Sequence, residues 1–128
     1  MPSIIKEFWL FSKDGLPIAE FSGGGTLDKT LMGGIVSAIK IFSQQLTSKG
    51  LQSLLLEQDK LTFGKSHEGH AILVFRTDSK IKDKKIQKLC KDIVKIFEEL
   101  YDVNDIITWD GDVNYFDGFK EKLQKFLK

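Results

Sequence analysis

The sequence predicts an α/β (α+β) fold built on a five-stranded antiparallel sheet. Three features of the 128 residues predict it. Two strand-like runs near the N-terminus meet at a tight turn, a long amphipathic helix follows, and three more strand-like runs precede two closing helices. The connections are short, so consecutive strands can pair as hairpins and an antiparallel sheet is the simplest topology.

The first two strands are predicted at residues 4–12 and 16–21. The first run is rich in β-branched and aromatic residues and alternates imperfectly between two faces. Asp14 and Gly15 lie between the runs, and Asp-Gly between two apolar runs is a strong hairpin signal. Pro17 has no amide hydrogen to donate, so we expect it at the start of the second strand or on an edge of the sheet.

A long helix is predicted over residues 26–49. Its apolar residues recur at helical spacing, namely Leu27, Leu31, Ile35, Ala38, Ile39, Phe42 and Leu46. Gly33 and Gly34 lie inside this helix, where each glycine costs about 1 kcal/mol relative to alanine. We therefore expect a close approach of the helix backbone to the sheet at these glycines. Met32, Val36 and Ile41 are apolar but lie off the main stripe, which makes them candidates for partner binding.

The remaining strands are predicted at residues 51–58, 60–65 and 70–77. The last of them is continuously apolar, as expected of a central strand. A helix over residues 82–101 follows, and its apolar stripe is Ile86, Leu89, Cys90, Ile93, Val94, Phe97 and Leu100. A less regular stretch over 102–114 leads to a final helix with Phe116, Phe119, Leu123, Phe126 and Leu127 on one side. The predicted core includes Ile35, Ile39, Phe42, Ile72, Val74, Ile93 and Phe97.

Composition limits the class of protein. The formal net charge of +1 argues against a dedicated nucleic-acid-binding protein. Cys90 is the only cysteine, which excludes an internal disulfide framework and fits a reducing compartment. No apolar run approaches the roughly 18 residues that a membrane span needs, and the N-terminus does not resemble a signal peptide. The expectation is a single cytoplasmic domain over residues 1–128.

Two backbone segments could bind an ion, and each has a simpler interpretation. Residues 23–25 are glycines that precede a helix, where amides can hold a phosphate, but the ending of a P-loop is missing, so a connector is favoured. Calcium-loop spacing is present in Asp110, Asp112, Asn114 and Glu121. Tyr115 stands where that loop requires glycine, so a polar turn with Asn114 or Asp117 capping the last helix is favoured.

His67, His70 and Cys90 are the remaining candidate metal ligands. They lack a fourth partner, and Cys90 falls on an apolar helical stripe, so we interpret it as a small core residue. No nucleophile is accompanied by a recognisable base. The sequence therefore predicts no enzyme, no metal and no cofactor.

Lysines crowd the helix over residues 82–101 and its approach: Lys80, Lys82, Lys84, Lys85, Lys88, Lys91 and Lys95. Asp78, Asp83 and Asp92 dilute them. A solvated face is the favoured interpretation. The alternative is peripheral contact with anionic lipid, at about 1 kcal/mol per well-placed lysine.

The order of elements resembles the longin domain, a relative of the roadblock fold. The matching segments are Phe8-Trp9-Leu10-Phe11, the turn Asp14-Gly15, the return strand Ile18 to Phe21, the helix Leu27 to Leu46, and the meander Leu54 to Phe75. The resemblance implies that the first long helix lies on one face of the sheet and the last two lie on the other. Longin and roadblock proteins are typically non-catalytic platforms that dimerise and serve small GTPases, trafficking machinery or membrane tethers.

The resemblance therefore implies a homo- or heterodimer with a longin- or roadblock-like domain, and a small GTPase as partner. The alternative is a small-molecule or lipid-sensing domain of the profilin, PAS or GAF kind, because these also stack helices on a five-stranded antiparallel sheet. A sensor should enclose a pocket, whereas a platform should have a packed core. The absence of an initial helix argues against profilin.

Overall fold

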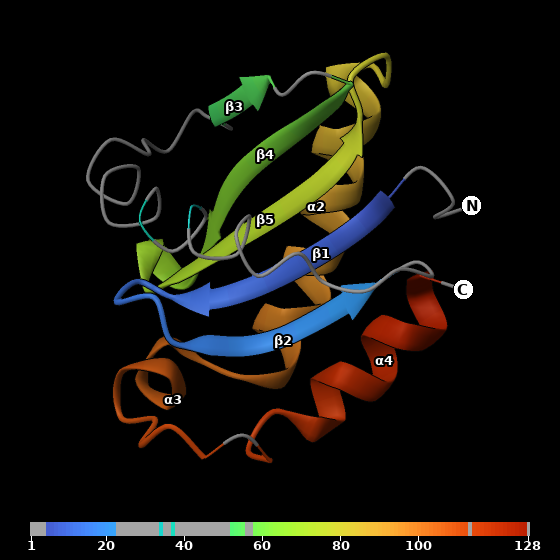
Figure 1. The fold of residues 1–128 in the computed structure, drawn as a ribbon. Helices are drawn as coiled ribbons and strands as arrows, with labels where there is room; N and C mark the ends of the chain where they lie inside the picture. Colours follow the sequence, from blue (N-terminus) through green and yellow to red (C-terminus); the bar gives the residue numbers. More distant parts are fainter. Residues whose placement is uncertain are drawn as a thin grey trace.

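A computed structural model describes residues 5–22, 34, 37, 52–55, 58–112 and 114–127. These residues contain a mixed α/β fold whose sheet has the strand order β2-β1-β5-β4-β3 (Figure 1). The strands are β1 (Ile5–Ser12), β2 (Pro17–Ser22), β3 (Gln52–Leu55), β4 (Asp59–Ser66) and β5 (Ala71–Asp78). Every pairing between neighbouring strands is antiparallel, which confirms the predicted class of sheet.

The centre of the sheet is β5, which pairs with β1 on one side and β4 on the other. Its continuously apolar run from Ala71 to Phe75 is fully buried, as predicted for a central strand. Among the described strands, the edges of the sheet are β2 and β3. Pro17 is the first residue of edge strand β2, as expected from its missing amide hydrogen. Of the predicted strand at 51–58, the structure describes Gln52–Leu55 as β3 and Gln58 as a bend whose carbonyl accepts a hydrogen bond from the Ser79 amide; residues 51, 56 and 57 lie outside the described residues.

The first hairpin turns where the sequence predicts it. Gly15 has φ = 91°, a left-handed conformation that glycine adopts without strain, and its amide donates to the Ser12 carbonyl at 2.9 Å. The Ser12 hydroxyl accepts hydrogen bonds from the amides of Asp14 (3.3 Å) and Leu16 (3.1 Å). The serine side chain therefore holds the turn closed and fixes the register of β1 against β2.

Three helices follow β5 and share one hydrophobic core with the sheet (Figure 1). They are α2 (Asp83–Leu100), α3 (Val103–Ile107) and α4 (Asp117–Leu127). α2 packs against β4 and α4, and α4 also reaches β2. The sheet contributes residues that alternate along its strands, including Phe8, Leu10, Leu73 and Phe75. The helices contribute Ile86, Leu89, Cys90, Ile93, Phe97, Ile106, Phe119, Leu123 and Leu127, and the turn before α4 adds Phe116.

α3 lies in a stretch that the sequence pattern predicts to be irregular, so that prediction is wrong for residues 103–107. A capping box starts this helix: the Asp105 amide donates to Asp102 Oδ1 at 2.9 Å, and the Asp102 amide donates to Asp105 Oδ2 at 2.9 Å. The spacing of two aspartates three residues apart is the signal that could have revealed it. The prediction that Leu100 belongs to the apolar stripe of this helix is also wrong. Leu100 is 36% exposed at the end of α2, where the chain turns towards α3.

The alternate residues of the central strands are buried as well. Trp9, Phe11, Phe63, Ile72 and Val74 point to the face opposite α2, and each is at most 2% exposed. The core predictions for Ile72, Val74, Ile93 and Phe97 are therefore confirmed.

The predicted helix at 26–49 lies outside the described residues except at Gly34 and Ser37, which both have helical backbone. Ile35, Ile39 and Phe42 also lie outside them, so their burial stays a prediction. Gly34 is exposed, and a Cβ added to it would meet no atom within 4 Å. The predicted close approach to the sheet is therefore wrong at Gly34.

Candidate functional site

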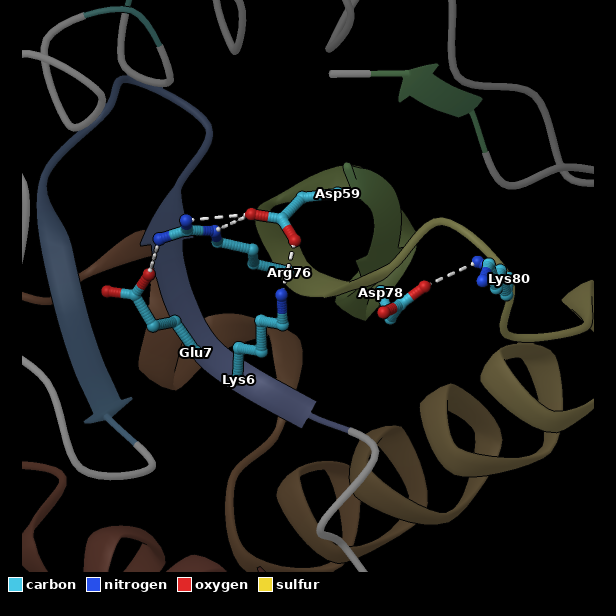
Figure 2. Close-up of polar contacts among 6 residues, drawn as sticks. All are labelled: Lys6, Glu7, Asp59, Arg76, Asp78 and Lys80. Carbon is cyan, nitrogen blue, oxygen red and sulfur yellow. Dashed lines mark hydrogen bonds and ion pairs between the residues drawn. The ribbon is translucent and has the colours of Figure 1, made fainter. Parts of the chain in front are cut away.

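A cluster of charged side chains lies at one end of the sheet, on the face opposite α2 (Figure 2). Arg76 of central strand β5 stands between Glu7 of β1, its partner in register, and Asp59 of β4. Lys6 joins the cluster because the register between β1 and β5 shifts between Ile5 and Glu7. We call these four residues, Lys6, Glu7, Asp59 and Arg76, the sheet-end network.

Each charge in the sheet-end network has an opposite charge beside it. Asp59 Oδ2 accepts from Arg76 Nε at 2.8 Å and lies 2.7 Å from Nη2. Asp59 Oδ1 accepts from Lys6 Nζ, and Glu7 Oε1 accepts from Arg76 Nη1. Two cations and two carboxylates make the network neutral overall, and it crosses three neighbouring strands.

Electrostatics inside the network favour the charged form of Asp59. Burial by itself opposes ionisation, but hydrogen bonds from Lys6 and Arg76 outweigh it and lower the pKa of the Asp59 carboxyl. Glu7 Oε2 and Trp9 Nε1 are buried and have no hydrogen-bond partner among the described residues. Because the other carboxylate oxygens are already engaged with cations, the network acts as a cross-link between strands rather than as a set of free acids and bases.

A second ion pair ties α2 to the sheet. Lys60 of β4 is 7% exposed, and its Nζ lies 2.6 Å from Asp83 Oδ1 and donates to the Ile81 carbonyl at 2.9 Å. Asp83 is the first residue of α2, where the helix dipole favours a negative charge. The pair therefore fixes the N-terminal end of α2 against β4.

His67 occupies a strained turn between β4 and β5 rather than a ligand site. It begins the 3₁₀ turn η2 (His67–Gly69), whose residues all have positive φ, and its side chain is buried against the Phe97 ring. Its Nε2 lies 2.7 Å from the Tyr101 carbonyl, which only accepts, so Nε2 carries the proton. The Glu98 carboxylate accepts from the His67 amide at 2.9 Å. These bonds attach the turn to the end of α2.

The other candidate ligands also have structural roles. Cys90 is 6% exposed in the core, which confirms its interpretation as a core residue, and burial raises the pKa of its thiol to about 12. The carboxylates of Asp110 and Asp112 accept from the amides of Asp112 (3.0 Å) and Asn114 (2.9 Å). Among the described residues, no group of three or more His, Cys, Asp or Glu side chains is placed to hold a metal ion.

The favoured polar turn is therefore present in the described residues 110–112 and 114, with one correction. Asp117 is the first residue of α4 rather than its cap, and its amide donates to the Asn114 backbone carbonyl at 3.2 Å.

The predicted partner-binding residues Met32, Val36 and Ile41 lie outside the described residues, as does the glycine run at 23–25. The structure does show a second candidate surface, the β3 edge of the sheet, where Leu55 is 70% exposed. The lysines of α2 form a third, because Lys84, Lys85, Lys88, Lys91 and Lys95 are all exposed. In the part of the chain with described coordinates, no helix is both long and apolar enough to cross a membrane.

Sequence patterns alone missed the sheet-end network. A signal for it does exist, because Glu7, Asp59 and Arg76 are charged residues that lie in or beside apolar runs near the ends of their strands. Charges at such positions are rarely fully buried unless they are paired. To predict which of these charged residues meet, one needs the strand order and register, and the spacing of hydrophobic residues does not give them.

The sheet order and the helices on one face correspond to the predicted longin-like fold, and solved structures of MglB share this fold. The gliding protein MglB of Thermus thermophilus matches with a TM-score of 0.54 and 18% identity over 74% of this chain and 79% of that chain. Myxococcus xanthus MglB matches with a TM-score of 0.53 and 22% identity over 76% and 80%. An MglB structure with a tetrameric arrangement matches with a TM-score of 0.54 and 19% identity over 76% and 80%.

At these identities the likeness establishes the fold. No protein-family model matches the sequence, and the search of curated proteins gave no match either.

Proposed function

We propose that this chain is a single longin-like domain that acts as a non-catalytic protein-interaction module. It serves as a dimerising platform for a small GTPase or a vesicle-trafficking-type complex. The observation that carries the proposal is the sheet order β2-β1-β5-β4-β3 with α2, α3 and α4 on one face, a fold shared with the MglB structures. Longin and roadblock proteins with this architecture typically engage GTPases rather than catalyse reactions themselves.

Two surfaces are the candidates for pairing. One is the apolar set Met32, Val36 and Ile41 on the predicted first helix. The other is the β3 edge, where no described strand lies beyond β3 and its hydrogen-bond ladder can extend into a second chain. The β2 edge is the weaker candidate, because Pro17 removes a donor at its first position. The tetrameric arrangement of one MglB structure supports self-association through a domain of this type.

The experiment that tests the GTPase partner is affinity capture followed by direct binding. The full chain is immobilised and exposed to native cytosol charged with GDP or with a non-hydrolysable GTP analogue, and bound proteins are identified by mass spectrometry. We expect a small GTPase to be enriched over an unrelated bait of similar size and charge. The captured GTPase is then purified and titrated in both nucleotide states.

Saturable binding that differs between the two nucleotide states supports the proposal. A GTPase that is recovered but does not bind when purified contradicts it, as does recovery of no GTPase in either state. Tight binding of a small molecule or lipid by a monomeric domain that encloses a pocket would instead support a sensor.

A further inference from the structure

The lysines of α2 form a continuous line along its outer side. Lys84, Lys88, Lys91 and Lys95 follow the spacing i, i+4, i+7, i+11. With 3.6 residues per turn, the four side chains fall within about 60° of one another around the helix axis. They span about 16 Å along that axis, at 1.5 Å per residue. We call these four residues the lysine stripe.

The lysine stripe points directly away from the sheet. The residues of α2 that enter the core include Ile86, Ile93 and Phe97, and Ile93 lies about 170° around the helix from the centre of the stripe. Figure 1 shows α2 lying along the sheet, so the opposite side of the helix is the outer surface of this layer. All four lysines are exposed, and within the described residues none of them makes an ion pair.

Part of the charge order along α2 opposes the stability of the helix, although Asp92 and Glu99 each lie four residues after a lysine of the stripe and offset some of the repulsion. Consecutive members of the stripe are three or four residues apart, where like charges repel and destabilise a helix. Lys84 and Lys85 lie in the first turn, where the helix dipole disfavours cations, whereas Glu98 and Glu99 lie in the last turn, where it disfavours anions. Asp83, the acidic residue of the first turn, already pairs with Lys60. A polyanion beside the stripe would relieve this repulsion.

The outer side of α4 provides a contrast within the same layer. Its exposed residues at equivalent spacing are Asp117, Glu121 and Lys125, which carry mixed charges. The whole chain has a net charge of only +1. The positive charge of the stripe is therefore a local feature of α2 and not a consequence of a basic protein.

The chemistry of the stripe favours a lipid surface over a protein or a nucleic acid. Protein interfaces are enriched in aromatic residues and arginine and depleted in lysine. Sites for single-stranded nucleic acid add aromatic side chains on which bases stack. The exposed positions of α2 carry no arginine and no aromatic residue. A straight row of hydrated ammonium groups matches the diffuse negative potential of an anionic bilayer, which attracts lysines without specific geometry.

We propose that the lysine stripe of α2 docks this protein reversibly on an anionic membrane surface, with the helix axis parallel to the bilayer. This proposal is independent of the proposed function. Lys80, Lys82 and Lys85 are exposed beside the N-terminal half of the stripe and extend the attractive surface there. Binding of this kind is electrostatic, so it weakens as salt shortens the range of the surface potential.

Vesicle co-sedimentation tests the proposal with three proteins. They are the parent chain, a stripe variant (Lys88→Gln, Lys91→Gln, Lys95→Gln), and a control variant (Lys13→Gln, Lys122→Gln, Lys125→Gln) that loses the same charge from other exposed lysines. Vesicles contain phosphatidylcholine alone or with about 30 mol % phosphatidylserine. We expect the parent to bind only the anionic vesicles, the stripe variant to bind at least about tenfold more weakly, and the control to stay within about twofold of the parent.

A charge-preserving variant with arginine at positions 88, 91 and 95 guards against a loss of folding and is expected to retain binding. Equal losses in the stripe and control variants would overturn the proposal. So would failure of the parent to bind anionic vesicles at low salt, or equal binding to both vesicle types. Stripe-dependent binding of an acidic peptide or an oligonucleotide without any vesicle binding would assign the stripe to that partner instead.

Discussion

Arg76 directs two nitrogens to the same oxygen of Asp59, with Nε 2.8 Å and Nη2 2.7 Å from Oδ2. The contact joins the central strand β5 to β4, and the third nitrogen of the same guanidinium reaches Glu7 on β1. One side chain therefore spans three strands at the end of the sheet. Such a pair specifies register, because a slip of one residue would leave buried carboxylates without a cation.

Replacing Arg76 with methionine is expected to destabilise the fold by about 3–5 kcal/mol, because Glu7 keeps a buried charge without a partner. Urea denaturation of parent and variant measures this loss. A matched triple variant with Arg76→Met, Glu7→Gln and Asp59→Asn removes the carboxylates too and is expected to lose less. A cost below about 1 kcal/mol for Arg76→Met alone would show that the network is not a cross-link.

Lowering the pH is expected to destabilise the folded protein, because Asp59 becomes protonated. Lys6 and Arg76 lower the pKa of this carboxyl in the folded state, so its stabilising effect is fully present above its unfolded pKa of about 3.9. That effect is lost as the pH falls through the lower folded pKa. The free energy of unfolding, measured by urea between about pH 6 and pH 2, is predicted to fall less steeply for Asp59→Asn than for the parent. Identical acid slopes in the two proteins would contradict the assignment.

The Cys90 thiol is expected to be inert in the folded protein. It is 6% exposed, and burial raises its pKa to about 12, so the reactive thiolate is scarce at neutral pH. A chromogenic disulfide reagent at about pH 7.5 is predicted to react slowly with the native chain and fully with the chain unfolded in guanidinium. Rapid reaction of the native protein would mean that α2 separates readily from the sheet.

Gly34→Ala is expected to stabilise the protein by about 0.5–1 kcal/mol. Gly34 has helical backbone, is exposed, and leaves open space for a Cβ, so alanine removes an entropic cost of folding without a clash. Chemical denaturation measures the difference. A destabilised variant would show that the predicted close approach does occur in solution.

The spacing of hydrophobic residues along the sequence predicted much of the fold. The hairpin at Asp14-Gly15 and the central position of β5 followed from local patterns that the structure confirms. The edge position of Pro17 followed from its missing donor. The lysine stripe is also visible in the sequence, because helical spacing alone aligns its members.

Features that depend on contacts between distant residues could not be predicted in the same way. Glu7, Asp59 and Arg76 meet because of strand order and register, which no local pattern encodes. α3 is only five residues long, so its capping box is a stronger sequence signal than the spacing of its apolar residues. Leu100 matched the apolar stripe of α2, yet it lies where the helix ends.

Pairing with a second longin-like domain is the part of the proposed function that one measurement tests most directly. Light scattering after size-exclusion chromatography, at tens of micromolar chain, gives the molar mass of the parent, of Val36→Glu and of Leu55→Glu. We expect a dimer for the parent and a folded monomer for the one variant that places a carboxylate in the interface, because a charge buried without a partner opposes association. Loss of the dimer in Val36→Glu alone assigns the predicted first helix, and loss in Leu55→Glu alone assigns the β3 edge. A parent chain that stays monomeric across this range, and that captures no longin-like partner or small GTPase, would contradict the proposed function.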